Sequence, residues 1–269
     1  MATITAAMVN ELRSKTGLGM MECKKLLTEA EGNLEKAIDI ARKKGVKTSI
    51  QERSASEGRI VASEHGHVAA AVEINCSTDF AAKSDAFGKL LELALHKLLN
   101  NSTADLREDA EVKQAVVSTA QITGENVQIG KTAVVSNQQG NVGAYVYAIT
   151  NKIAVLMSFS GNKPEADLIK QLGGHIAFSR PLGLNRSDVA PEIVAKERDI
   201  AIEQAKATGK PQQIAEKIAE GKLNSFFAER VLLDQEFFNA AVFKGTIANM
   251  LKSKGITLEK YVRLEVGQA

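Results

Sequence analysis

The chain has 269 residues, 34 Lys and Arg against 32 Asp and Glu, and a formal net charge of +2. With 44% hydrophobic and 25% charged residues, it has the composition of an ordinary folded protein, and its length predicts more than one domain. It contains no apolar run of about 18 residues, so no membrane span is expected. Its first residues lack the basic and apolar regions of a secretory signal, so we expect a cytoplasmic protein. The near-neutral charge argues against a dedicated nucleic-acid-binding protein.

The side chains that usually support catalysis or metal binding are scarce. Two cysteines, Cys23 and Cys76, are too few for a disulfide framework or a four-cysteine metal cluster. His65 and His67 could bracket a metal ion, but two ligands in one turn do not form a site. No nucleophile motif of the form Gly-x-Ser-x-Gly occurs. The sequence therefore predicts no catalytic residue, no metal site and no cofactor.

The stretch from Gly124 to Thr132 (GENVQIGKT) resembles a phosphate-binding loop but departs from it in two ways. Five residues separate its glycines instead of four, and Lys131 leads into a predicted strand rather than a helix. A turn at the start of a strand is the expected structure, and no direct nucleotide binding is expected.

Residues 1–53 are predicted to form a head of three short helices and a linker. Thr5 and Asn33 are the expected N-caps of the first and third helices, and Gly45 ends the third. The stretch from 47 to 57 is polar and Ser-rich, which is typical of a linker. The expected buried stripe of the second helix consists of Met20, Cys23, Leu27 and Ala30.

Residues 54–140 are acidic, with 7 basic against 11 acidic side chains, and begin with two short apolar runs that predict a β-hairpin (59–63 and 68–75). Thr78 is the expected cap of a long helix, in which apolar residues from Phe87 to Leu98 recur at helical spacing. A further helix at 106–119 and a strand at 128–136 follow.

The second part of the core, residues 141–186 and 222–269, repeats the order of hairpin and helix. Its predicted elements are strands at 142–149 and 153–160, helices at 164–178 and 246–254, and a last strand around 261–266. The pairs Phe226-Phe227 and Phe237-Phe238 are expected in the core.

Residues 187–221 are predicted to form an inserted antiparallel helical hairpin that turns at Gly209 and stops at Gly221. Its apolar stripe is thin and consists of Ile193, Ile200, Ile214 and Ile218. Two such helices bury little surface together, so we expect a partner elsewhere. The order of elements as a whole predicts an α+β fold.

The segment from Glu73 to Phe80 (EINCSTDF) runs from a predicted strand into a helix start. With Thr78 as cap, Asp79 and Phe80 lie in the first turn, where the helix dipole favours an aspartate. Phe80 would join the apolar stripe of Phe87 one heptad earlier, but the polar residues 83 and 84 interrupt that stripe. The residues alone leave open whether Phe80 is buried or projects from the surface.

Two segments closely resemble the signatures of one family. Residues 16–27 (TGLGMMECKKLL) are similar to the N-terminal signature of bacterial translation elongation factor Ts, and residues 75–83 (NCSTDFAAK) resemble its second signature. The segment His175-Ile176-Ala177 and residues 262–267 (VRLEVG) also match. The resemblance covers essentially the whole chain. It implies a three-helix ubiquitin-associated-like head, a two-subdomain α+β core with hairpin-plus-helix units, and an inserted helical hairpin.

The resemblance also implies a function. A member of this family is not an enzyme but a guanine-nucleotide exchange factor, which binds elongation factor Tu carrying GDP and promotes GDP release. The Asp and Phe of its Thr-Asp-Phe motif press on the switch region of the partner's G domain and disturb the Mg²⁺ site. Thr78, Asp79 and Phe80 match that motif. Further contacts with the G domain and the neighbouring domain are expected from Leu18, Met20, Met21, Lys24, Ile122, Gly124 and His175.

Two other expectations concern partners. Since the inserted hairpin dimerises in some members of the family, residues 187–221 are expected to mediate either self-association as a homodimer or a secondary contact with elongation factor Tu. The alternative function is RNA binding by the basic head, whose candidate residues are Arg42, Lys43, Lys44 and Lys47. No aromatic stacking platform accompanies these residues, and charge runs at helix ends are more often solvated caps.

Overall fold

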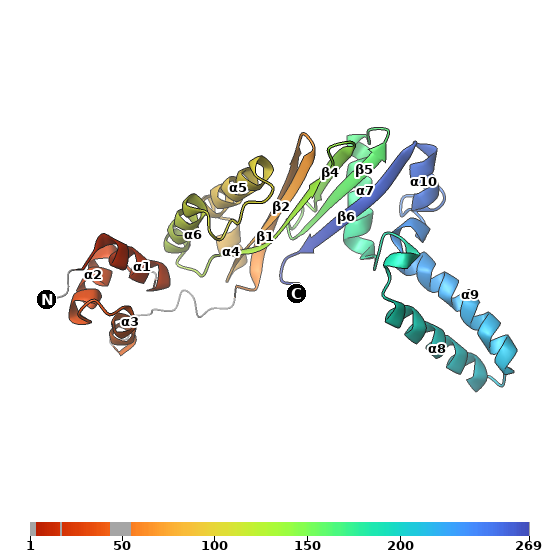
Figure 1. Cartoon of the computed structure of the whole chain (residues 1–269), viewed down its shortest axis with the longest axis horizontal. Helices are drawn as coiled ribbons and strands as arrows, with labels where there is room; N and C mark the ends of the chain where they lie inside the picture. Colours follow the sequence, from red (N-terminus) through yellow and green to blue (C-terminus); the bar gives the residue numbers. More distant parts are fainter. Residues whose placement is uncertain (1–3, 17, 44–54, 269) are drawn as a thin grey trace.

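The computed structural model describes residues 4–16, 18–43 and 55–268, with all side chains there except those of residues 14, 15, 39, 42 and 43. The fold is α+β, with two antiparallel sheets in the middle of an elongated molecule (Figure 1). A three-helix head lies at one end of the molecule and a helical hairpin at the other (Figure 1).

The head consists of α1 (Ala6–Thr16), α2 (Met20–Glu29) and α3 (Leu34–Lys43). The Thr5 hydroxyl accepts a hydrogen bond from Met8 N at 3.3 Å, and Asn33 Oδ1 accepts one from Lys36 N at 3.0 Å. Both predicted caps are therefore confirmed. The predicted end of the third helix at Gly45, and most of the predicted linker, lie outside the described residues.

The predicted stripe of α2 needs one correction. Met20 is exposed, and Leu26 is buried beside Cys23 and Leu27 instead. Met20 is the first residue of α2, and helical side chains tilt toward the N-terminus, so its side chain extends beyond the end of the helix. The head has a core of its own, formed by Val9, Leu12, Cys23, Leu26, Leu27, Ala30, Ala37 and Ala41.

The first sheet contains β1 (Glu57–His65), β2 (Val68–Cys76) and β3 (Gln128–Ser136), in this order and all antiparallel. It confirms the predicted hairpin and third strand, and it places Gly130 and Lys131 within β3 rather than in a phosphate-binding loop. Three helices share a core with this sheet: α4 (Asp79–Ala82), α5 (Asp85–Asn100) and α6 (Ala110–Thr123). Ile74, Phe87 and Leu91 lie in the core that these helices share with the sheet.

The second sheet contains β4 (Asn141–Val146), β5 (Ile153–Gly161) and β6 (Ile256–Glu265), again antiparallel. α7 (Ala166–Ser179) packs on β4 and β5, and α10 (Ile247–Ser253) packs on β6. As in the first sheet, a hairpin is followed by a helix and by a third strand that pairs with the second strand of the hairpin. The order of hairpin and helix seen in the sequence therefore reflects two sheets built in the same way.

The two sheets meet through a small apolar layer rich in alanine. Its buried residues are Ile60, Ala69, Ala71 and Val135 from the first sheet and Val142, Ala154, Leu156 and Leu264 from the second. A backbone hydrogen bond of 2.7 Å from Ile60 N to Asn151 O also joins them. In addition, the buried carboxylate of Glu73 on β2 accepts a hydrogen bond from Gly267 N at 3.2 Å. The end of β2, which leads to Thr78, is therefore fixed against the second sheet.

The inserted hairpin consists of α8 (Pro191–Ala207) and α9 (Gln212–Arg230), between the 3₁₀ turns η1 (Arg186–Asp188) and η2 (Leu232–Asp234). Its helices pack through four buried alanines, Ala201, Ala205, Ala215 and Ala219. Small side chains let two helices approach closely, so the larger isoleucines lie outside the contact. Ile193, Ile200 and Ile214 are exposed.

Two predictions for this region are wrong. The expected stop at Gly221 does not occur, because α9 continues to Arg230 and a glycine inside a helix costs only about 1 kcal/mol relative to alanine. Of the two phenylalanine pairs expected in the core, only Phe237 is buried, whereas Phe238 is exposed. Phe226 and Phe227 are half-buried on α9. Adjacent side chains point in different directions, so the burial of Phe237 does not carry Phe238 into the core.

Two helical glycines offer a matched test of packing. A methyl group added at Gly173 of α7 would lie 2.6 Å from Tyr145 Cγ on β4, whereas one at Gly221 would meet nothing within 4 Å. We expect Gly173→Ala to destabilise the fold by about 1–3 kcal/mol through overpacking. We expect Gly221→Ala to stabilise it by about 0.5–1 kcal/mol through helix propensity. Urea unfolding measures both effects, and equal stability of the two variants would contradict the packing of α7 on β4.

Candidate partner-binding site

α4 is a single short helix separate from α5, which corrects the predicted long helix beginning at Thr78. Thr78 does cap α4, because its hydroxyl accepts a hydrogen bond from Ala81 N at 3.3 Å. Ser84 then caps α5 by accepting a hydrogen bond from Phe87 N at 3.3 Å. Serine favours an N-cap over a helix interior because its hydroxyl competes for backbone groups, which explains the break.

The break leaves Phe80 outside the apolar core. Its side chain is 81% exposed, whereas the next two residues, Ala81 and Ala82, are buried. α4 therefore lies on the sheet with its alanines and presents Phe80 to solvent, so Phe80 projects from the surface. Burial of a phenylalanine contributes about 1.5–3 kcal/mol, and this free energy is available to a partner that covers the side chain.

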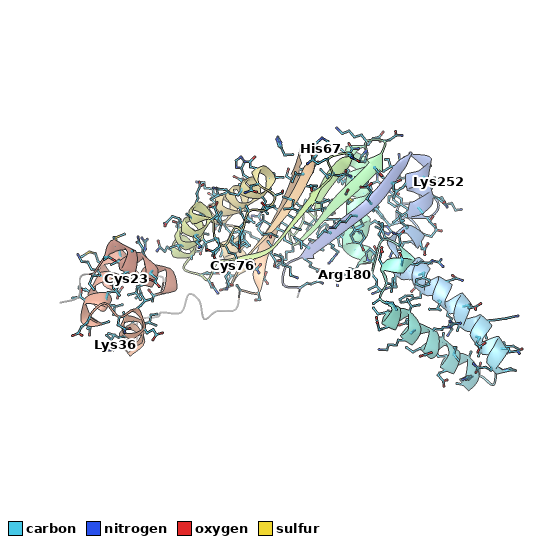
Figure 2. All side chains as sticks on the ribbon, in the orientation of Figure 1. Cys23, Lys36, His67, Cys76, Arg180 and Lys252 are labelled. Atoms are coloured by element: carbon cyan, nitrogen blue, oxygen red, sulfur yellow. The ribbon has the colours of Figure 1, made fainter. Side chains whose placement is uncertain are left out.

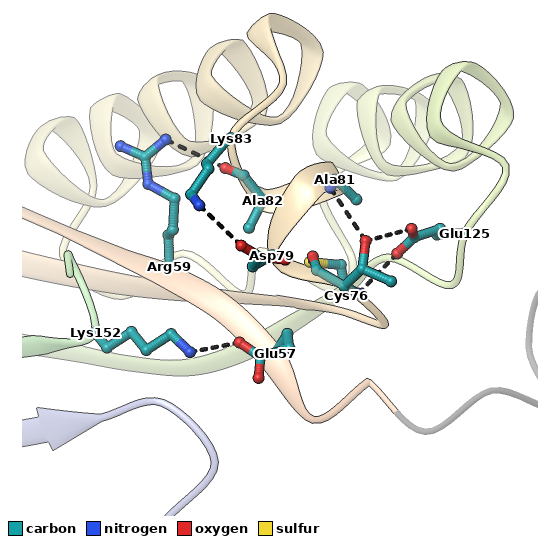
Figure 3. A network of polar contacts seen from close by, with 10 residues as sticks. Glu57, Arg59, Cys76, Asp79, Ala81, Ala82, Lys83, Glu125 and Lys152 are labelled. Atoms are coloured by element: carbon teal, nitrogen blue, oxygen red, sulfur yellow. Dashed lines mark hydrogen bonds and ion pairs between the residues drawn. The ribbon is translucent and has the colours of Figure 1, made fainter.

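Both ends of α4 are tied to neighbouring elements (Figure 3). At its start, the Glu125 carboxylate accepts hydrogen bonds from Thr78 N at 2.9 Å, Ser77 N at 3.2 Å and the Thr78 hydroxyl at 2.5 Å. At its end, the Arg59 guanidinium on β1 donates to Ala82 O at 3.2 Å. These contacts hold the backbone that carries Phe80. They were not predicted, since 47 residues separate Thr78 from Glu125 and no local pattern joins them.

Asp79 is exposed beside Phe80 and forms an ion pair with Lys83 at 2.8 Å. The hydrogen bond from Lys83 lowers the pKa of the Asp79 carboxyl below its ordinary value, so Asp79 is ionised at neutral pH. An exposed ion pair contributes little to stability. The result is an ionised carboxylate next to an exposed aromatic ring.

The buried thiol of Cys76 lies just before this segment and donates a hydrogen bond to Thr78 O at 3.1 Å. Burial, with the negative charge of Glu125, raises the pKa of this thiol to about 11. Cys76 is therefore a neutral thiol at physiological pH. Cys23, the other free cysteine, is buried in the head (Figure 2).

The end of α6 lies beside the Thr78 segment. Ile122 in its last turn is 71% exposed, and Gly124 ends the helix in the left-handed conformation with φ +69°. Glycine adopts this conformation without the penalty that a side chain would bring. The next residue is Glu125, which reaches Ser77 and Thr78. Two of the predicted contact residues, Phe80 and Ile122, are therefore carried by segments that Glu125 joins.

The head supplies further exposed apolar residues. Met21 is 73% exposed, Met20 and Lys24 are also exposed, and Leu18 is half-buried against the head core. The Arg13 guanidinium on α1 donates a hydrogen bond to the Gln121 side chain on α6, directly before Ile122. The head therefore lies beside the end of α6 (Figure 1).

His175 lies elsewhere, on α7 in the second sheet, and the structure does not bring it next to Asp79 (Figure 1). Its side chain is only 7% exposed; Nε2 donates to Gln235 Oε1 at 2.8 Å, and Nδ1 accepts from Phe238 N at 3.3 Å. The ring lines a hollow of about 510 Å³ together with Tyr145, Phe178 and Phe238. His175 therefore contributes one buried wall of this hollow and exposes little of its own side chain to solvent.

A pH dependence of stability follows from this burial. Burial lowers the pKa of His175 below its ordinary value of 6.5, so the unfolded chain binds a proton there at higher pH than the folded protein. Above about pH 6.5, His175 is neutral in both states and does not lower the free energy of unfolding. As the pH drops from 6.5 toward the folded-state pKa, the free energy of unfolding should fall by at most about 1.4 kcal/mol per pH unit. Urea unfolding across this window measures the slope. His175→Gln should flatten it, and an unchanged slope in that variant would rule out His175 as the cause.

The described residues contain no group of three His, Cys, Asp or Glu side chains placed to hold a metal ion. No helix in the described ranges is both long and apolar enough to cross a membrane. Near α4 the described residues present two exposed apolar side chains, Phe80 and Ile122.

A family model described as Elongation factor TS matches residues 77–268, from the residue before Thr78 almost to the last residue of the chain. The chain belongs to the elongation factor Ts family. Curated proteins named Elongation factor Ts are similar over nearly their whole length. That of Methylococcus capsulatus is 39% identical over 278 residues, covering 99% of this chain and 93% of its own. Those of Aliivibrio salmonicida and Hahella chejuensis are each 39% identical, covering 100% of this chain and 93% of their own.

These matches confirm the family that the two signatures indicated. The protein is a translation elongation factor, and the relatives include the head in their similarity, although the family model begins after it.

Proposed function

We propose that the chain is a guanine-nucleotide exchange factor that binds elongation factor Tu carrying GDP and promotes GDP release during translation elongation in the cytoplasm. The observation that carries this proposal is the exposure of Phe80 on a helix tied at both ends. A side chain held in this way enters a partner without the entropic cost of ordering a loop. Phe80 presses on the switch region of the partner's G domain.

Asp79 acts beside Phe80 on the Mg²⁺ site. It is exposed and ionised, and it forms an ion pair with the exposed Lys83 ammonium. A carboxylate oxygen is the kind of ligand that Mg²⁺ prefers, so the Asp79 carboxylate would disturb a Mg²⁺ site placed next to it, by attracting the ion or by repelling nearby phosphates. Loss of Mg²⁺ weakens the hold of elongation factor Tu on GDP.

The other contacts lie to either side of α4. On the G domain, we assign them to the head residues Leu18, Met20, Met21 and Lys24 and to Ile122 and Gly124 at the end of α6. His175 acts on the neighbouring domain of elongation factor Tu through the hollow that it lines. We further propose that the working units are the head and linker (1–53), two core subdomains and the inserted hairpin. The first subdomain is 54–140. Because α9 continues to Arg230, the end of the hairpin moves from 221 to 230, so the second subdomain is 141–186 with 231–269.

Exchange by this route depends on coupling between two binding events on elongation factor Tu, that of GDP and that of this chain, because the chain does not react with GDP. It must bind nucleotide-free elongation factor Tu more tightly than the GDP-bound form, and GDP must weaken its binding by the same factor. Isothermal titration of elongation factor Tu with this chain, with and without saturating GDP, tests the proposal. We expect GDP to weaken binding at least about tenfold. Equal affinities would overturn the proposal, since a ligand that binds both states equally shifts neither.

The alternative, RNA binding by the head, gains no support from the family. Lys44 and Lys47 lie outside the described residues, as do the side chains of Arg42 and Lys43 at the end of α3. The exposed apolar residues around α4 are better suited to a protein partner than to a phosphate backbone.

We also propose that the chain forms a homodimer through the α8–α9 hairpin. Three isoleucines, Ile193, Ile200 and Ile214, are exposed there, while the contact between the helices is made by alanines. Changing all three isoleucines to serine should convert the dimer to a monomer without unfolding the hairpin. Sedimentation equilibrium measures the mass, with Asp199→Ser, at an exposed position on α8, as a control for surface substitution. The same mass for wild type and the triple variant would remove the hairpin as the dimer contact.

A further inference from the structure

The segment that carries Phe80 is held by a residue, Glu125, to which the proposed function assigns no role. Glu125 is half-buried, and its carboxylate accepts three hydrogen bonds from two consecutive residues, Ser77 and Thr78. Its own backbone is fixed on both sides, by the left-handed Gly124 before it and by the buried Val127 two residues after it. Hydrogen bonds to a carboxylate are stronger than those between neutral groups.

The geometry also fixes the direction of the Thr78 hydroxyl proton. This hydroxyl donates to Glu125 Oε1 at 2.5 Å and accepts from Ala81 N at 3.3 Å. A hydroxyl has one proton, so donating it to Glu125 leaves a lone pair directed at Ala81 N. Glu125 therefore holds Thr78 in the orientation in which it caps α4.

We propose that Glu125 is a positioning residue for nucleotide exchange: it fixes the direction in which Phe80 projects and joins α4 to the end of α6, which carries Ile122. This inference rests on the proposed function. Arg59, at the other end of α4, contacts a single backbone oxygen and makes no such link to α6. Through Glu125, Phe80 and Ile122 form one preorganised surface rather than two independent contacts.

The expected effects separate positioning from direct contact. Glu125→Ala should lower the rate of GDP release from elongation factor Tu about tenfold. Glu125→Gln should retain most of the rate, because its amide oxygen can accept the two backbone hydrogen bonds and its NH₂ group can donate to the Thr78 hydroxyl. Glu108, an exposed glutamate paired with Lys113, is the matched control. With Glu108→Ala, elongation factor Tu should release GDP at the same rate as with the wild-type chain.

A double-mutant cycle with Phe80→Ala provides the decisive comparison. If Glu125 acts through Phe80, adding Glu125→Ala to Phe80→Ala should reduce the rate by less than about twofold further. If the two reductions multiply in full, Glu125 acts independently of Phe80 and the proposal is overturned.

Amide hydrogen exchange tests the positioning without a partner. In Glu125→Ala the amides of Ser77, Thr78 and Ala81 should exchange faster than in wild type, while the amides of β5 keep their protection. Unchanged exchange at these three amides would overturn the proposal, as would faster exchange with an unaltered rate of GDP release. Failure of the proposed function is recognised separately, because wild type itself would then not accelerate GDP release, whatever the amides show.

Discussion

Replacing Phe80 by alanine is expected to lower the rate of GDP release from elongation factor Tu about thirtyfold and to leave the melting temperature almost unchanged. Thirtyfold corresponds to about 2 kcal/mol of lost transition-state stabilisation, which is the order expected when a phenylalanine no longer becomes buried in a partner. The fold should not suffer, because Phe80 is 81% exposed and the buried contacts of α4 are made by Ala81 and Ala82.

Phe87 is the matched control for this variant. It lies one heptad later, is completely buried and belongs to the core of the first sheet. Phe87→Ala should destabilise the fold by about 3–5 kcal/mol. Stopped-flow release of labelled GDP and thermal unfolding give the two readouts for both variants. If Phe80→Ala behaves like Phe87→Ala, with a large drop in melting temperature and normal exchange per folded molecule, Phe80 is a structural residue.

Removing the head is expected to have the second large effect. A chain that begins at Ala55 should fold, because the buried head core is made only of residues between Val9 and Ala41, all within the head. It should bind elongation factor Tu at least about tenfold more weakly, since it lacks the exposed Met20 and Met21. Thermal unfolding and titration calorimetry measure the two outcomes.

A full-length variant separates the contact residues from the head as a whole. Met20→Ser combined with Met21→Ser leaves the buried stripe of α2 intact, because both side chains are exposed. It should reproduce most of the loss in affinity. Full affinity and full exchange in the truncated chain would remove the head from the mechanism.

Local patterns predicted much of the secondary structure. The caps at Thr5, Asn33 and Thr78 follow from side-chain chemistry within a few residues. The break between α4 and α5 was the local feature misread: polar residues at 83 and 84 interrupt the stripe, but only the capping by Ser84 shows that the helix restarts. This break decides the exposure of Phe80, which periodicity alone left open.

Features that depend on distant contacts could not be predicted in this way. The four alanines between α8 and α9 resemble ordinary helix formers, so the sequence did not indicate that they make the contact between the two helices. The role of Glu125 depends on bringing the end of α6 next to Thr78, which is set by the packing of α5 and α6 on the first sheet. The resemblance to a family indicated Asp79 and Phe80 as contacts, but not the residues that hold them in place.

The most direct test of the central claim is the release of fluorescently labelled GDP from elongation factor Tu, followed by stopped flow at increasing concentrations of this chain. We expect the release rate to rise with concentration and then saturate, at least about tenfold above the spontaneous rate, which is a barrier lower by about 1.4 kcal/mol. A release rate that stays at the spontaneous value at every concentration would contradict the claim that the chain is a nucleotide exchange factor.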